Sequence, residues 1–218
     1  MVRDVTVKEL GIEPVVPRRG AKKRKWGLIA REIPVFCGIV KALAPRRAVE
    51  LGTAFGLTAE MIREMSPGCQ VLSIDYEDHK SERPAELGEI DQAIDFIIAD
   101  TRVVQLPQDW YGSTDLVFVD AGHMRDNVVN DTRLAISLVS PGGVIIWHDL
   151  LLPGGKRDRA KGLHSRHQYY IGEYLYNHLP LDVMRIKDTV LGVHVNHSPE
   201  EAEGSLPSFL REGEGTAS

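Results

Sequence analysis

Five short and mainly apolar stretches, separated by segments with helical spacing, constrain most strongly how this chain can fold. In chain order they cover residues 48–51, 71–74, 93–98, 116–119 and 144–147. Apolar runs of strand length are typical of strands buried on both faces, as in a parallel sheet covered by helices. Right-handed crossovers then join the strands. The sequence therefore predicts a doubly wound α/β fold with a mostly parallel sheet.

Apolar residues at helical spacing lie between and after these stretches. The pattern predicts helices over residues 34–44, 57–65, 125–139 and 169–179. Pro34 suits a first helical turn and Pro45 ends that helix. Two further apolar segments, residues 183–186 and 190–195, are close enough in sequence to form an antiparallel hairpin at the sheet edge.

The domain organisation follows from where the periodicity starts and stops. We expect an N-terminal arm over residues 1–25, one domain over residues 26–196 and a flexible tail over residues 197–218, which are rich in Glu, Gly, Ser and Pro. Pro141-Gly142-Gly143 predicts a turn before the last apolar stretch.

Composition narrows the class of protein. Hydrophobic residues make up 43% of 218 residues, which suits a single core, and the formal net charge of −5 argues against nucleic acid as the partner. No apolar run has transmembrane length, and the N-terminus lacks the pattern of a secretory signal. The two cysteines, Cys37 and Cys69, have no metal or disulfide spacing. We therefore expect a cytoplasmic protein without a membrane partner.

Basic residues gather in two runs, over residues 18–25 and 156–166. Each is either a solvated loop or a contact with an anionic substrate or partner. The second run lies in residues 153–170, which also carry two histidines and two tyrosines and are either a substrate lid or a mobile loop. Trp26, beside the first run, could also lie over a substrate.

Ligands of open α/β sheets bind beyond the carboxyl ends of the strands, so the loops there hold the candidate site. The first strand leads into Glu50-Leu51-Gly52-Thr53-Ala54-Phe55-Gly56, where glycines permit a sharp turn and close approach to a ligand. Its spacing is neither that of a Walker phosphate loop nor that of the dinucleotide fingerprint. The loop is thus a different ligand-binding loop or simply a tight strand-to-helix turn.

Acidic residues follow the next two strands. Asp75 lies about 20 residues beyond the glycine loop, where a carboxylate can accept hydrogen bonds from ribose hydroxyls or cap a helix. Asp100 follows the third strand and could meet an adenine amino group, or act as a turn or capping residue.

The fourth and fifth strands place a second polar group at the same rim. Asp120 and His123 follow the fourth strand, and His148 and Asp149 follow the fifth. Carboxylates and imidazoles at one place are competent ligands for a divalent cation. The alternative is a hydrogen-bonded polar cluster without metal.

The order of these motifs resembles the class I S-adenosylmethionine-dependent methyltransferases over roughly residues 30–196. Residues 115–123 and 142–149 are similar to small-molecule O-methyltransferases related to the macrocin and cephalosporin-biosynthesis group. The resemblance implies a Rossmann-like, seven-stranded sheet with an antiparallel last strand. The cofactor contacts that we expect are Glu50, Gly52, Thr53, Gly56, Asp75, Asp100 and Asp120.

The resemblance also implies a divalent ion, because metal-dependent relatives hold one with an acid after the fourth strand and a pair after the fifth. Those positions match Asp120, His148 and Asp149. Many relatives carry a carboxylate where this chain has His148, which shifts the preference from magnesium toward manganese or zinc.

The predicted function is methyl transfer from S-adenosylmethionine to a hydroxyl of a small, sugar-bearing or anionic acceptor. A metal would lower the pKa of that hydroxyl. Otherwise His123 or His148 would act as general base beside Asp120, with a structural role for His123 as the alternative.

Three other functions and one question of assembly stay open at this point. A nicotinamide-dependent oxidoreductase is disfavoured by the glycine spacing and by the lack of an evident Tyr-x-x-x-Lys pair. A non-catalytic protein that binds S-adenosylmethionine or a nucleotide would not need carboxylates at the rim. An RNA methyltransferase is kept open by the basic run at residues 18–25. Whether the chain forms a homo-oligomer also stays open.

Overall fold

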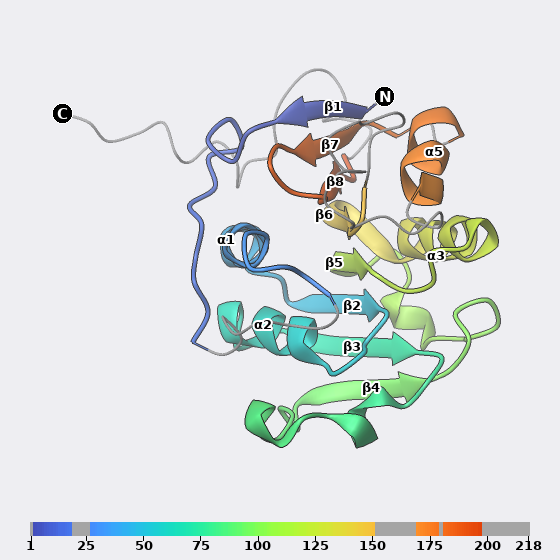
Figure 1. The fold of residues 1–218 in the computed structure, drawn as a ribbon. Helices are drawn as coiled ribbons and strands as arrows, with labels where there is room; N and C mark the ends of the chain where they lie inside the picture. The colour runs from blue at the N-terminus through green and yellow to red at the C-terminus, as the bar shows by residue number, and fades with distance from the viewer. Residues whose placement is uncertain (1, 19–26, 151–168, 179–180, 198–218) are drawn as a thin grey trace.

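A computed structural model describes residues 2–18, 27–150, 169–178 and 181–197. These form one sheet with helices on both faces (Figure 1). The strands are β1 (Val2–Val5), β2 (Arg47–Leu51), β3 (Gln70–Asp75), β4 (Ile94–Ile98), β5 (Thr114–Val119), β6 (Val139–Trp147), β7 (Val183–Ile186) and β8 (Gly192–Val195). The helices are α1 (Ile33–Leu43), α2 (Leu57–Met65), α3 (Arg125–Leu138) and α5 (Tyr169–Asn177), with short 3₁₀ helices over His79–Glu82, Ala85–Leu87 and Gln108–Trp110.

The sheet has the order β1-β7-β8-β6-β5-β2-β3-β4. All pairs among β2 to β6 are parallel, and β8 runs antiparallel to both β6 and β7. The predicted doubly wound, mostly parallel sheet with an antiparallel C-terminal hairpin is therefore confirmed.

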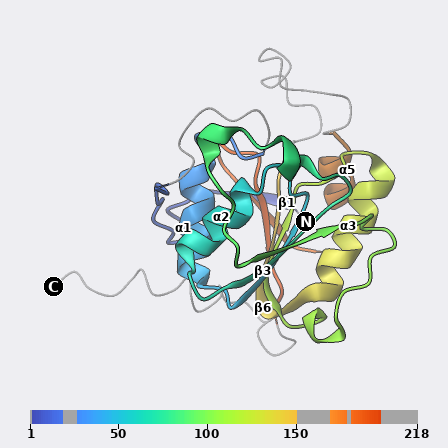
Figure 2. The ribbon, with the colours of Figure 1, turned by 90° about the horizontal axis from the view of Figure 1, so that it is seen from below.

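Burial on both faces explains the apolar run over residues 116–119 of β5. Successive side chains of a strand point to opposite faces. In β5, Leu116 and Phe118 pack into the core beneath α1 and α2, whereas Val117 and Val119 pack into the core beneath α3 and α5. Figure 2 shows these two helix pairs on opposite sides of the sheet.

The predicted helices are present in the described part of the chain. Pro34 occupies the first turn of α1, and the helix ends at Ala44, whose φ of 46° is left-handed, just before Pro45. Helix α5 covers most of the expected segment, and Leu179 lies outside the described residues.

An eighth strand joins the sheet, where the resemblance implied seven. Residues 2–5 of the expected arm form β1, which pairs in parallel with β7. The Arg185 guanidinium on β7 donates two hydrogen bonds of 2.8 Å to the Asp4 carboxylate. This pairing joins residues about 180 positions apart in sequence, so no local pattern predicts it. The division into arm, domain and tail stays a prediction.

The expected turn at Pro141-Gly142-Gly143 is wrong, because these residues belong to β6. Pairing with β5 jumps from Thr114 opposite Val139 to Leu116 opposite Val144, so the intervening residues form a bulge. The Gly142 N–H donates to the Asn196 carbonyl at 2.6 Å, and the Asn196 N–H donates to the Gly143 carbonyl at 2.9 Å. These hydrogen bonds keep the segment within the sheet.

Several sequence features lie outside the described residues. They are most of the first basic run with Trp26, the whole second basic run, residues 153–168 of the expected lid, and the tail beyond residue 197. Among the helices that are described, none combines the length and apolar character needed to cross a membrane. Cys37 and Cys69 are both buried and form no disulfide.

Candidate functional site

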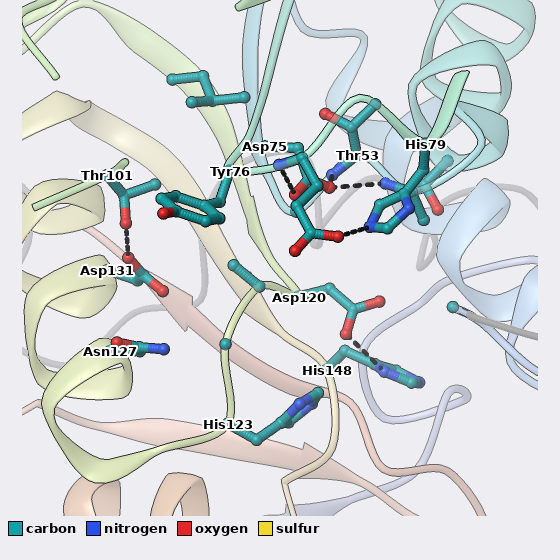
Figure 3. A pocket seen from close by; sticks show the side chains of 18 of the residues that line it. Thr53, Asp75, Tyr76, His79, Thr101, Asp120, His123, Asn127, Asp131 and His148 are labelled. Carbon is teal, nitrogen blue, oxygen red and sulfur yellow. Dashed lines mark hydrogen bonds and ion pairs between the residues drawn. The ribbon is translucent and has the colours of Figure 1, made fainter. Parts of the chain in front are cut away.

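The strand order reverses between β2 and β5, and this switch point is where ligands of such sheets bind. The Asp120 N–H donates to the Leu51 carbonyl at 2.8 Å, and the His148 N–H donates to the Val119 carbonyl at 3.0 Å. The loops after β2, β5 and β6 thereby start at the same level. A cleft of about 970 Å³ opens beside them (Figure 3).

Most of the predicted site residues line this one cleft. They are Gly52, Thr53, Asp75, Asp100, Asp120, His123, His148 and Asp149. The two remaining predictions, Glu50 and Gly56, are not among its lining residues. The structure thus brings the glycine loop and the polar rim together, as the strand-end argument predicted.

Close backbone packing explains the glycine at position 52. Gly52 has a φ of 98°, and a Cβ there would lie 2.2 Å from the Asp120 carbonyl oxygen. The following loop is fixed by Asp75, whose Oδ2 accepts hydrogen bonds from the N–H groups of Thr53 and Ala54 at 2.8 and 2.9 Å. Asp75 therefore shapes the loop as well as lining the cleft.

Glu50 supports the same loop from behind. Its side chain is 1% exposed and accepts a hydrogen bond from the Ser73 hydroxyl, which is also 2.7 Å from the Thr53 hydroxyl. Burial raises the pKa of Glu50 to about 8. The carboxyl group holds a proton at neutral pH and acts as a structural hydrogen-bonding group beneath the loop.

Arg83 is a second support that sequence reasoning missed. Its guanidinium donates to the carbonyls of Phe55, Leu87 and Gly88, the last two at 3.1 and 2.9 Å. It also pairs with Glu60 of α2 at 2.8 Å, and both side chains are almost fully buried. A single arginine in a polar stretch belongs to no motif, so the sequence held no signal for it.

The far end of the cleft carries two further acids. Arg102 donates to both carboxylate oxygens of Asp100, and this bonding holds the pKa of Asp100 below its ordinary value. Asp131 of α3, another residue that the sequence analysis missed, accepts a hydrogen bond from the Thr101 hydroxyl at 2.5 Å. Burial raises the pKa of Asp131.

At the rim, four side chains form a continuous hydrogen-bonded chain. The ring Nδ1 of His148 lies 3.1 Å from Asp120 Oδ1 and 3.4 Å from Asp149 Oδ2. Nε2 of His123 lies 2.9 Å from the same Asp149 oxygen. Asp149 has a left-handed φ of 57°, a conformation that costs energy for most residues and that Asp tolerates better than most.

A fifth member of the chain, Glu32, was not predicted. Its Oε2 lies 3.1 Å from Nε2 of His148, and its side chain is fully buried. Both ring nitrogens of His148 thus face carboxylates and its side chain is 7% exposed, whereas the His123 side chain is 33% exposed. Glu32 lies before α1, far in sequence from the strand-end motifs, so motif spacing could not reveal it.

The hydrogen bonds and ion pairs within the rim shift the pKa values of its side chains. Burial would raise the pKa of Asp149, but hydrogen bonds from His123 and His148 outweigh it and hold the pKa well below its ordinary value. Burial acts against a charge on His148, yet Asp120 and the other acids raise its pKa well above the ordinary value. The hydrogen bond to Asp149 also raises the pKa of His123.

Asp120, His123 and Asp149 each offer a ligand atom within 4.8 Å of the others'. Two carboxylates and one imidazole are a donor set that suits a divalent cation. The predicted ligands were Asp120, His148 and Asp149. In the structure His123, rather than His148, is grouped with the two aspartates. The two ring nitrogens of His148 face Glu32 and the aspartates instead.

Comparison with known proteins identifies the fold and gives a family match to part of the chain. Residues 49–150 match a family described as a methyltransferase domain. The matched segment spans just under half of the chain. This match and the fold shared with the solved structures below confirm the sequence prediction of a class I, S-adenosylmethionine-dependent methyltransferase. The narrower resemblance to the macrocin group stays a prediction.

Solved structures share the fold of the methyltransferase at low sequence identity. Cofactor-bound Rv0187 from MTB has 18% identity and a TM-score of 0.60, and the match covers 82% of this chain and 85% of that one. A putative caffeoyl-CoA O-methyltransferase from Staphylococcus aureus has 13% identity, a TM-score of 0.59, and coverage of 78% and 85%. The O-methyltransferase TomG from Streptomyces achromogenes, in complex with S-adenosylmethionine, has 17% identity, a TM-score of 0.55, and coverage of 79% and 82%. No curated protein matched the chain by sequence.

Replacing Gly52 tests the packing at the switch point. We expect Gly52→Ala to weaken S-adenosylmethionine binding at least tenfold, because the new Cβ would push the loop away from Asp120. Calorimetric titration measures the dissociation constant. Gly68→Ala is the matched control, since a Cβ there meets nothing within 4 Å. Unchanged affinity in Gly52→Ala would show that this contact does not shape the cofactor site.

The raised pKa of Glu50 predicts a pH dependence of stability. The folded chain keeps the Glu50 proton up to about pH 8, whereas a glutamate with the ordinary pKa of 4.5 loses it earlier. The folded state therefore binds more protons between these values, and stability falls as pH rises through that window. Between pH 5 and 7, the free energy of unfolding should fall about 2 kcal/mol more in the wild type than in Glu50→Gln. Urea unfolding at both pH values measures this, and parallel behaviour would contradict it.

Proposed function

We propose that the methyltransferase binds S-adenosylmethionine in the cleft at the switch point and transfers its methyl group to a hydroxyl of a small molecule. One observation carries the proposal: a single cleft is lined both by the glycine loop with Asp75 and by the rim of Asp120, His123 and Asp149. A cofactor seated on the loop would present its methyl group to the rim. TomG and the Staphylococcus aureus protein, which share the fold, are described as O-methyltransferases.

The cofactor would be held along the carboxyl ends of β2, β3 and β4. The loop at Gly52 and Thr53 would meet its methionine part, and Asp75 its ribose. Each carboxylate oxygen has two lone pairs, so the Oδ1 of Asp75, which accepts from the Glu77 N–H at 3.2 Å, can accept a ribose hydroxyl too. The adenine would reach the end of the cleft lined by Asp100 and Asp131.

Charge favours a cationic sulfonium at the rim. Glu32, Asp120 and Asp149 are three acids, so even two charged imidazoles leave the group formally net negative. Opposite charges attract most strongly where water is excluded, as in this partly buried cluster. The methyl-bearing sulfonium would gain from this field, and the neutral thioether product would not.

Methyl transfer requires an in-line attack by the acceptor oxygen on the methyl carbon, while the carbon–sulfur bond breaks and its electron pair stays on sulfur. Much of the rate can come from holding the two at near-attack distance. The acceptor hydroxyl must also lose its proton. His123 is placed to take it, because it lines the cleft and its Nε2 is oriented by Asp149, which leaves Nδ1 as the proton-accepting nitrogen.

A divalent cation would be held by Asp120, His123 and Asp149, where it would supply a Lewis acid that lowers the pKa of the acceptor hydroxyl. His123 would then be a ligand rather than a base. The two routes use the same residues and differ in one measurable property, the need for metal.

The proposal extends to the chemical class of the methyl acceptor and to the cellular location of the protein. We expect a small, sugar-bearing or anionic acceptor, which the basic runs in the sequence support. A cytoplasmic location without nucleic-acid or membrane partners is supported by the net charge of −5 and by the two cysteines, which form no disulfide.

Asp120→Asn tests the rim directly. The amide keeps the shape of the side chain but removes the charge that faces His148, so we expect kcat to fall at least 100-fold with the fold preserved. The assay follows methyl transfer from labelled S-adenosylmethionine to a panel of phenols, catechols and hydroxylated glycosides. Asp126→Asn is the control, since Asp126 is exposed and does not line the cleft. Full turnover by Asp120→Asn would contradict the assignment of the rim as the site of methyl transfer.

Dialysis against a chelator tests the cation. Because the rim is formally net negative and presents three ligand atoms, we expect activity to fall at least tenfold and to return with manganese, magnesium or zinc. Metal content before and after dialysis is measured by mass spectrometry. Unchanged activity of the metal-free protein would rule out the cation and leave His123 as the base.

A further inference from the structure

The segment over residues 27–32 precedes α1 and the matched residues 49–150, and it lies beside the rim. Gly27 and Ile29 line the cleft, and a Cβ on Gly27 would lie 3.9 Å from Asp120 Oδ2. Glu32, at the start of α1, does not line the cleft and is fully buried. Its carboxylate therefore lies behind the site rather than in it.

Three donors from separate parts of the chain converge on the Glu32 carboxylate. Oε2 accepts from the Ile29 N–H at 3.1 Å and lies 3.1 Å from Nε2 of His148. Oε1 accepts from the Val190 N–H at 3.1 Å. An ionised carboxylate carries no hydrogen and can accept from all three, whereas a glutamine amide would turn an N–H toward at least one of these donors.

Glu32 fixes one end of the His148 ring, and the aspartates of the rim fix the other. Nδ1 of His148 lies 3.1 Å from Asp120 and 3.4 Å from Asp149, the two acids that line the cleft. The Phe118 ring lies beside the imidazole, with centroids 6.5 Å apart. The His148 ring thus links the buried Glu32 carboxylate to both carboxylates of the rim.

We infer that Glu32 is a positioning residue for methyl transfer, which holds the His148 imidazole so that its Nδ1 faces Asp120 and Asp149. This inference rests on the proposed function of the same cleft. It assigns to a residue outside the matched family segment the task of keeping the rim carboxylates in place. Glu32 does so without touching cofactor or acceptor.

A double-mutant cycle tests whether Glu32 acts through His148. The variants are Glu32→Gln, His148→Asn and the combination, assayed with the compound of the panel above that the wild type methylates fastest. Glu32→Gln should lower kcat at least tenfold and leave KM for S-adenosylmethionine within threefold. Added to His148→Asn, it should lower kcat by less than a further twofold, because residues that act as one unit have non-additive effects.

Two further variants keep the cycle interpretable. Thr189→Val removes the hydrogen bond from the Leu191 N–H to the Thr189 hydroxyl in the loop that Glu32 also contacts, and should keep kcat within threefold. Glu32→Asp, one methylene shorter, enters the same cycle with the same expectation, so the result does not depend on one variant folding. If the losses in kcat of the Glu32 and His148 single variants multiply in the double variant, the two residues act independently and the inference is overturned. Wild-type kcat in both Glu32 variants would also overturn it.

A spectroscopic measurement separates this inference from the proposed function. The ring ¹⁵N signals of His148, identified by their loss in His148→Asn, should shift in the Glu32 variants, whereas affinity for S-adenosylhomocysteine should stay within threefold. If no compound is methylated, the proposed function fails while the ring signals still test the contact. Unchanged His148 signals in a folded Glu32 variant would show that Glu32 does not position the ring.

Discussion

The site depends on the contact between the backbones of Gly52 and Asp120 at the switch point of the sheet. The ends of β2 and β5 approach so closely that a Cβ on Gly52 would lie 2.2 Å from the Asp120 carbonyl oxygen. The contact places the loop that would carry the cofactor directly against the acid that begins the polar rim. Glu50 and Arg83 hold the loop from behind, so its shape is set by buried groups rather than by the ligand.

The same contact explains how a neutral loop and a charged rim share one cleft. At the loop, backbone N–H groups are satisfied by Asp75. At the rim, acids and imidazoles alternate from Glu32 to His123, so that each buried charge has a partner. The formal excess of acids would favour a cation at the rim, whether a sulfonium or a metal ion.

The sequence predicted the parts of this arrangement that local pattern controls. The apolar runs predicted the central strands because burial on both faces favours apolar side chains. The carboxyl ends of these strands predicted that Asp120, His148 and Asp149 would lie at one rim. The missed parts depend on contacts between distant segments. Strand β1 pairs with β7, about 180 residues away in the sequence. Glu32 contacts residues 29, 148 and 190. Neither feature has a signature in the adjacent sequence.

The predicted turn at residues 141–143 failed for a related reason. Pro and Gly favour a turn by their local conformations, but hydrogen bonds with Asn196 keep this segment in the sheet as a bulge. Likewise, the sequence placed His123 and His148 at the rim without separating their roles. Only the position of Glu32 shows that His148 is held at both ring nitrogens, whereas a hydrogen bond from Nε2 to Asp149 holds His123.

Calorimetric titration of the wild-type, metal-stripped protein with S-adenosylmethionine, with NAD as the comparison ligand, tests the central claim most directly. The account predicts binding of S-adenosylmethionine in the micromolar range and no detectable binding of NAD, because the glycine loop lacks the dinucleotide spacing. Binding of NAD in preference to S-adenosylmethionine, or binding of neither, would contradict the assignment of the cleft at the switch point as the cofactor site.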